Sequence, residues 1–287
     1  MNSFMGYGDD LLVTSLASKI KKQFPGRQIV IGNAEKNHAF HSPIYENNPN
    51  IADCRNLDND KPTHLINYHE FNRPYIDYEK TTKTNYVWKK FKPVPGELYF
   101  SNQEKKEAKK IISEAKKFWD ENHSKKFRNI IFLETSSTKI NDAQFSFKHQ
   151  NKDWGIENWK RLINKIKKDY LIIQSSHVQT KKIKGIFIPQ EIDFRLACAL
   201  LEEVDFYVGP EGGFGHVAAA LNKKAVLYFG GWISPDVIGY DFHENIYYEN
   251  NQSPCGVNSK LCEHCSEARE KITVDLFLKY IYRISSS

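Results

Sequence analysis

The stretch that decides the fold is GPEGGFGHVAAALNKKAVLYFGG, residues 209–231. An apolar run typical of a strand (204–208) leads into it, and a glycine-rich turn, an alanine-rich helix and a second strand (225–229) follow. Glycines at such a turn leave backbone N–H groups open to a ligand, and the N-terminus of the next helix favours an anion. The pattern therefore predicts a phosphate-binding turn with His216 as a donor. A plain glycine-rich connection with a capping histidine fits the same residues, and the stretch alone leaves both open.

Short apolar runs alternate with amphipathic stretches along the rest of the chain, which is typical of α/β proteins with parallel sheets. The segment 70–100 is aromatic and polar without a clear period, so we expect either a substrate-facing loop region or irregular packing there. Leu12, Leu16, Ile20 and Phe24, spaced by four, predict one face of a first helix. Strands are expected within 25–33 and 62–70 and at 129–134, 170–174, 184–188, 204–208 and 225–229, and further helices at 102–121, 156–168, 193–203, 214–222 and 272–284.

The polar stretch 121–129 breaks this pattern and suggests a boundary between two domains. We therefore expect a first domain at 1–125 and a second at 126–287, with the last helix packing back toward the first. Two such halves predict two Rossmann-like domains facing a central cleft. Ligands of these sheets bind beyond the carboxyl ends of the strands.

Composition limits the class of protein. The 287 residues are 40% hydrophobic and 13% aromatic, which is enough for a packed core. No run reaches the roughly 18 apolar residues of a membrane helix, and no secretory signal is recognised, so we expect a cytoplasmic protein. The net charge of +6 comes largely from lysine-rich helices, which indicate a solvated face or attraction to a phosphorylated ligand or an anionic membrane surface. No basic run is interleaved with aromatic residues, so no nucleic-acid partner is expected.

Residues 209–231 resemble the donor-site signature of glycosyltransferase family 9, the heptosyltransferase-like enzymes. That signature reads Gly-Pro-Asp-Ser-Gly-Pro-x-His-x-Ala-Ala-Ala-Leu-Gly-Lys-Pro and is followed by an apolar strand and Phe-Gly. Here Glu211 replaces the Asp, Gly212 the Ser and Phe214 the second Pro, while Gly213 and His216 stand as in the family. The resemblance implies a divergent branch. It also implies that residues 211–213 and His216 bind the donor.

A second match lies in GYGDDLLVTSLASKIKKQFPG, residues 6–26, which is similar to the opening Gly-Asp-x-Leu-x-x-Thr-Pro of the family. Gly8 and Asp9 fall on the Gly-Asp pair. The resemblance implies that Asp9 is the general base for the acceptor hydroxyl, with Gly8 and Asp10 beside the acceptor. A carboxylate within about 3 Å would activate such a poor nucleophile. The alternative is that Asp9 or Asp10 only caps the helix. The family usually has a full strand before this loop, where this chain has residues 1–5.

A third match is HQNKDWGIENWKRLINKIKK, residues 149–168, which resembles the Lys-x-Trp element of the family. By this resemblance, Lys152 contacts a donor phosphate and stabilises charge on the leaving group. Thr135 and Ser136 follow the strand at 129–134, where the family lines the donor site. Both are therefore candidate donor-binding residues.

The three matches occur in the order of the family and imply the GT-B architecture, with an acceptor domain followed by a nucleotide-sugar domain. They imply inverting, metal-independent transfer from a nucleotide sugar to a glycan or glycolipid of the cell surface or envelope. The alternative is a non-catalytic relative that binds a nucleotide or sugar. A dinucleotide-dependent dehydrogenase is disfavoured because no Gly-x-Gly-x-x-Gly follows a strand with an acid about 20 residues on.

Three of the five cysteines cluster as Cys255, Cys262 and Cys265, in the pattern Cys-x6-Cys-x2-Cys. Thiolates at such spacing can bind zinc or iron, although a fourth ligand is not obvious because the adjacent His264 can point away. Reduced thiols and a disulfide are the alternatives. The sequence leaves these three states open, and neither zinc nor iron is expected to be required for sugar transfer.

Overall fold

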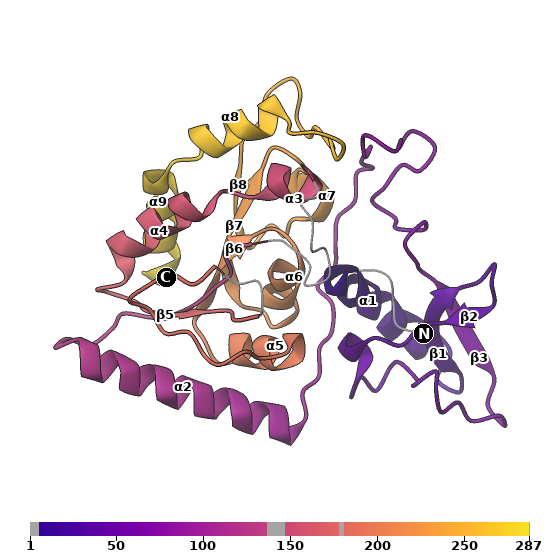
Figure 1. Cartoon of the computed structure of the whole chain (residues 1–287). Helices are drawn as coiled ribbons and strands as arrows, with labels where there is room; N and C mark the ends of the chain where they lie inside the picture. Colours follow the sequence, from indigo (N-terminus) through magenta and orange to yellow (C-terminus); the bar gives the residue numbers. More distant parts are fainter. Residues whose placement is uncertain (1–5, 137–146, 178–180, 287) are drawn as a thin grey trace.

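The computed structural model describes residues 6–136, 147–177 and 181–286. The chain forms two α/β lobes, each built around its own sheet (Figure 1). Residues 1–5, where the family usually has a full strand, lie outside the described residues. No helix within the described ranges is long and apolar enough to cross a bilayer.

The first lobe contains a three-stranded sheet in the order β2-β1-β3. Strand β1 (Gln28–Asn33) pairs in parallel with β3 (Thr63–Asn67) and antiparallel with the two-residue β2 (His38–Ala39). A short 3-10 helix, η1 (Pro43–Tyr45), follows β2. Both strands expected in this half of the chain are therefore confirmed.

Helix α1 (Tyr7–Gln23) confirms the first predicted helix, but the expected apolar face is wrong. Leu16 and Phe24 are each 42% exposed. The helix packs against β1 on one side and against a helix of the second lobe on another, so residues from more than one stripe are buried. These buried apolar residues are Leu11, Leu12, Val13 and Ala17.

The segment between β3 and α2 (Asn102–Asn122) forms isolated bridges but no helix or strand. It leaves the first lobe, runs beside the second lobe and ends in α2 (Figure 1). One bridge pairs Asn85 with Val257 of the second lobe. This segment, residues 68–101, therefore connects the two lobes along the chain and also contacts the second lobe.

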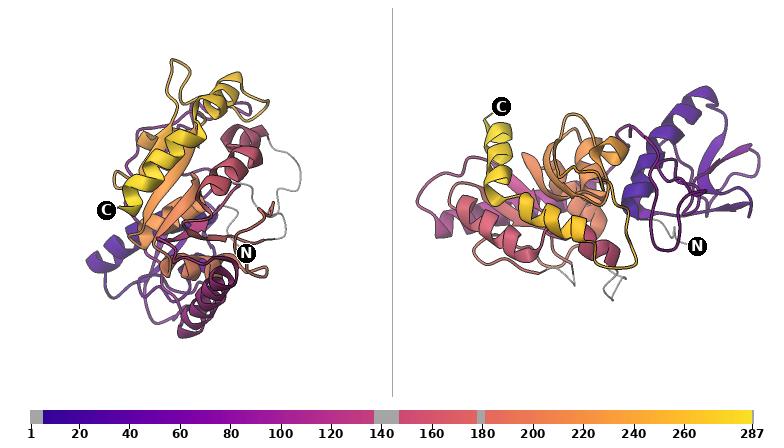
Figure 2. Two further views of the ribbon diagram at one scale, coloured as in Figure 1. Left: turned by 90° about the vertical axis from the view of Figure 1, so that its left-hand side faces the viewer. Right: turned by 90° about the horizontal axis from the view of Figure 1, so that it is seen from above.

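The second lobe contains a parallel five-stranded sheet in the order β5-β4-β6-β7-β8. Both faces are covered (Figure 2), so successive residues such as Phe132 and Leu133 belong to different buried clusters. The strands are β4 (Ile130–Leu133), β5 (Leu171–Gln174), β6 (Phe206–Pro210), β7 (Lys224–Gly230) and β8 (Glu244–Tyr247). The helices are α3 (Phe147–Lys152), α4 (Ile156–Ile166), α5 (Phe194–Glu202), α6 (Gly213–Ala220), α7 (Pro235–Ile238), α8 (Glu263–Lys271) and α9 (Val274–Ser285).

Three expectations for this half of the chain need correction. The strand expected at 184–188 is reduced to a bridge between Ile173 and Phe187. The last helix, α9, packs against α4 and β7 and so covers the second sheet instead of returning to the first lobe. Helix α2 precedes the expected boundary at 125, yet it packs against α5 and β5 of the second lobe.

Candidate active site

The N-termini of α1 and α6 meet between the lobes. A Cβ added to Gly8 of α1 would lie 2.9 Å from Cδ2 of His216 and 3.3 Å from Cα of Gly213, both in α6. Gly212 has φ +136°, a conformation that favours glycine. Among the described residues, no side chain forms a capping hydrogen bond at the N-terminus of either helix. The two sequence motifs, one from each lobe, are thus side by side.

Asp9 does not cap α1, since the N-cap residue is Gly6. Its side chain is only 10% exposed. The Tyr75 hydroxyl donates to Asp9 Oδ1 at 2.5 Å, and Arg73 Nη1 lies 3.4 Å from Asp9 Oδ2. The predicted base is therefore held by two residues that the sequence analysis missed.

Asp10 lies inside the first lobe and is fully buried. Its carboxylate accepts hydrogen bonds from the Ser42 hydroxyl at 2.7 Å and the Tyr45 hydroxyl at 3.2 Å. In this structure it is therefore not exposed to an acceptor, and it does not cap the helix. The two adjacent acids have separate sets of partners.

His216 is buried against Tyr240, whose hydroxyl lies 2.9 Å from His216 Nδ1. Burial lowers the pKa of His216 to about 4, so the imidazole is neutral near pH 7 and offers a hydrogen bond without a charge. This contact with the Tyr240 hydroxyl orients the imidazole ring of His216. A small pocket here is lined by Glu211, Gly212, Gly215, His216, Leu227, Phe229, Ile238 and Tyr240.

Lys152 forms a buried ion pair with Glu211. Lys152 Nζ lies 2.7 Å from Glu211 Oε1, and the side chains are 13% and 3% exposed. The end of α3 supplies the lysine, and the turn between β6 and α6 supplies the glutamate. Lys152 Nζ also lies 5.1 Å from the centre of the Trp232 ring, within cation–π range. The structure thus brings two predicted donor-site residues together.

Thr135 and Ser136 follow β4, and their backbone N–H groups donate to Glu134 Oε1 at 2.7 and 2.9 Å. The Ser175 hydroxyl donates to the other carboxylate oxygen. Burial raises the pKa of Glu134 to about 7, although these hydrogen bonds oppose the shift. Both backbone N–H groups are therefore engaged within the protein. The sequence analysis did not single out Glu134, although an acid at the end of an apolar strand could have indicated it.

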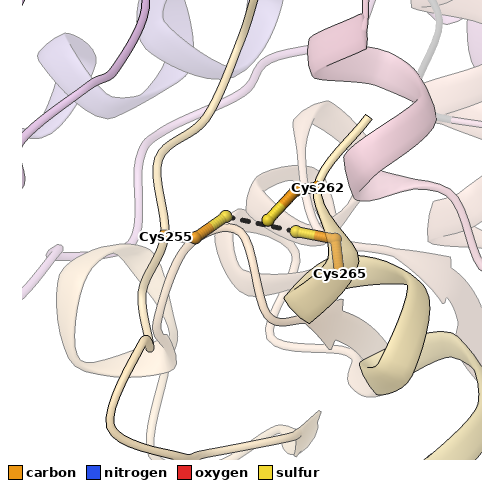
Figure 3. Close-up of side chains that lie close together, drawn as sticks. All are labelled: Cys255, Cys262 and Cys265. Carbon is orange, nitrogen blue, oxygen red and sulfur yellow. Dashed lines mark hydrogen bonds between the residues drawn. The ribbon is translucent and has the colours of Figure 1, made fainter. Parts of the chain in front are cut away.

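The three clustered cysteines point toward one another (Figure 3). Their sulfur atoms all lie within 4.8 Å of one another, and Cys255 Sγ is 3.2 Å from Cys265 Sγ. None of the three forms a disulfide, so the disulfide alternative is not what the structure shows. His264 is not part of the group and instead hydrogen-bonds to the Ser253 hydroxyl at 2.9 Å.

Asn151 of α3 holds the cysteine loop. Its side chain accepts from the Cys262 backbone N–H and donates to the carbonyl oxygens of Val257 and Lys260, each at 2.9 Å. Because Asn151 directly precedes Lys152, one short helix contacts both the cysteine cluster and the Glu211 turn.

Two α/β lobes that place the first turn of an N-terminal helix against the glycine-rich turn of a C-terminal parallel sheet define a protein of the GT-B class. The family comparison goes further: a match to glycosyltransferase family 9 (heptosyltransferase) spans residues 78–266, well over half of the chain. The chain belongs to this family. A search of curated protein sequences finds no match.

Two solved structures share the fold of the whole chain. The iron-containing dodecameric glycosyltransferase TibC from enterotoxigenic E. coli H10407 is 14% identical, with a TM-score of 0.60 over 98% of this chain and 74% of that one. A glycosyl transferase family 9 protein from Veillonella parvula DSM 2008 is 12% identical, with a TM-score of 0.58 over 98% and 94%. The match to a TibC complex with ADP-D-beta-D-heptose is 15% identical, has a TM-score of 0.40 over 57% of this chain, and spans only 47% of that chain.

Proposed function

We propose that this protein is an inverting glycosyltransferase that moves a sugar from a nucleotide-sugar donor to a hydroxyl of a cell-surface or envelope glycan. The observation that carries the proposal is the contact between Gly8, beside Asp9, and the turn at Gly213 and His216. A cytoplasmic location, where a glycolipid acceptor would be reached at the inner face of a membrane, is part of the same proposal.

In the proposed reaction, Asp9 removes the proton of the acceptor hydroxyl as its oxygen attacks the anomeric carbon. The new bond forms opposite the bond to the nucleotide diphosphate, which leaves, so the configuration inverts. Negative charge grows on the phosphate oxygens. Lys152, the N–H groups at Gly212 and Gly213, and neutral His216 stabilise that charge. These groups supply the stabilisation that a metal would otherwise give, and we therefore propose metal-independent transfer.

The proposal is tested by a thermal-shift screen with ADP-, GDP-, UDP-, CMP- and dTDP-sugars, followed by transfer assays. ADP-heptose belongs in the panel because the family is described as heptosyltransferase. A donor at 100 times its Kd should raise the Tm by about 5 °C, and the other nucleotides should not. No shift with any donor would contradict the proposal. Selective binding without turnover on any acceptor would favour the alternative, a non-catalytic binding protein.

We further propose that Cys255, Cys262 and Cys265 bind one zinc or iron ion as a structural cross-link of their loop. Thiolates around a tetrahedral ion at Zn–S distances of about 2.3 Å lie about 3.8 Å apart, which fits sulfur atoms gathered within 4.8 Å of one another. The bound metal would tie the loop to the start of α8, and it has no part in the proposed sugar transfer.

Protein purified without chelator should therefore contain a single zinc or iron ion per chain by elemental analysis. Cys262→Ser should lose most of that metal and lower the Tm, while Cys198→Ser, at a buried cysteine outside the cluster, should keep it. Metal-free wild-type protein, or equal metal content in the two variants, would show that the cluster consists of reduced thiols.

A further inference from the structure

We propose that Tyr75 and Arg73 are positioning residues that hold the Asp9 carboxylate in its reactive orientation. This inference rests on the proposed function, in which Asp9 is the base. It concerns a segment whose role the sequence left open.

The two residues contact different oxygens of the same carboxylate. Tyr75 donates to Oδ1 of Asp9, and Arg73 pairs with Oδ2. Arg73 is itself fixed, because its Nε donates to the Glu70 carbonyl oxygen and to the Tyr78 hydroxyl, each at 3.2 Å. Two directional contacts prevent rotation of the carboxyl group. Each carboxylate oxygen has a second lone pair, so an acceptor hydroxyl can still bind.

Packing explains the ring of Tyr75 but not its hydroxyl group. The Tyr75 ring already packs against Trp88 and Phe91, with centroid distances of 6.4 and 6.0 Å, and phenylalanine could make the same contacts. A buried hydroxyl is costly without a partner, and this one is satisfied by Asp9. The hydroxyl is therefore the part of the side chain to test.

The same segment is anchored on the second lobe close to the donor site. The Trp88 and Trp232 rings meet edge to face at 4.8 Å, and Trp88 Nε1 donates to the Trp232 carbonyl oxygen at 3.3 Å. The Trp232 ring also contacts Lys152. A continuous set of contacts thus joins Asp9 to Lys152, which keeps the base at a fixed place relative to the donor phosphates.

Asp10 provides a matched control. Tyr45 donates to Asp10 as Tyr75 donates to Asp9, and both tyrosines are buried to the same 8% exposure. Tyr45→Phe and Tyr75→Phe each remove one hydroxyl that donates to an aspartate of the same helix. A purely structural role predicts similar consequences for both variants.

The experiment compares the two variants in kcat, in KM for the donor and in Tm, using the donor found by the screen. Tyr75→Phe should lower kcat about 10-fold with the donor KM unchanged, while Tyr45→Phe should lower only the Tm. Arg73→Gln should also lower kcat, and Arg73→Lys should restore part of it. Equal kcat for Tyr75→Phe and the wild type would overturn the inference. An inactive wild type would overturn the proposed function, and this inference with it.

A measurement independent of turnover is a crystal structure of each variant. The Asp9 side chain should adopt more than one rotamer in Tyr75→Phe and a single rotamer in Tyr45→Phe. One well-ordered Asp9 rotamer in both variants would show that the tyrosine hydroxyl does not position the carboxylate.

Discussion

Asp9→Asn should lower kcat about 1000-fold while leaving the affinity for the nucleotide sugar almost unchanged. Asparagine has nearly the same shape. Its single amide oxygen can still accept from Arg73 while its NH2 group donates to the Tyr75 hydroxyl, but it cannot take a proton from the acceptor hydroxyl. The measurement is kcat together with donor affinity by calorimetry. Asp60→Asn, the same change at an exposed acid of the first lobe, is the control and should behave as the wild type.

This variant separates the two functions that the sequence left open. If Asp9→Asn binds the donor and fails to transfer, the carboxylate is needed for chemistry and the protein is an enzyme. Activity within a few-fold of the wild type would remove Asp9 from the role of base. Loss of donor binding would instead assign Asp9 to the donor side of the interface between the lobes, contrary to the division of roles proposed above.

Much of the second lobe could be predicted from the sequence because its signals are local. The glycines before α6 and the apolar strands on either side mark the unit by themselves, and β4, β5, β6 and β7 lie within a few residues of their expected positions. The exception at 184–188 has a local cause. Gly185 adopts φ +80°, which interrupts the extended backbone. Of residues 184–188, Phe187 is then the residue that forms a bridge with β5.

The partners of the site residues could not be predicted, since they depend on contacts between distant segments. Arg73 and Tyr75 lie 64 and 66 residues from Asp9, in a segment without helical or strand period. The spacing of apolar residues carries no information about such pairings. The buried face of α1 was mispredicted for the same reason, because the second lobe covers a side of this helix that a one-face pattern leaves to solvent.

The pairing of Lys152 with Glu211 was likewise absent from the sequence analysis, and it makes the second large effect testable. Lys152→Met should destabilise the protein by about 3–5 kcal/mol, because it leaves the Glu211 carboxylate buried without a partner. The double variant Lys152→Met/Glu211→Gln removes both charges and should recover most of that stability. The kcat of the double variant should still be about 100-fold lower than that of the wild type, because the cation that stabilises the phosphate charge is gone.

Chemical denaturation of the two variants, with kcat measured on each, distinguishes a structural lysine from a phosphate-binding one. In the double variant the stability should return while the transfer rate stays low, because only the stability depends on neutralising the charge of Glu211. If transfer returned together with stability, Lys152 would serve only to neutralise Glu211. The α6 N-terminus and His216 alone would then stabilise the charge on the phosphate. The ion pair would only hold the conformation of the turn that begins at Glu211.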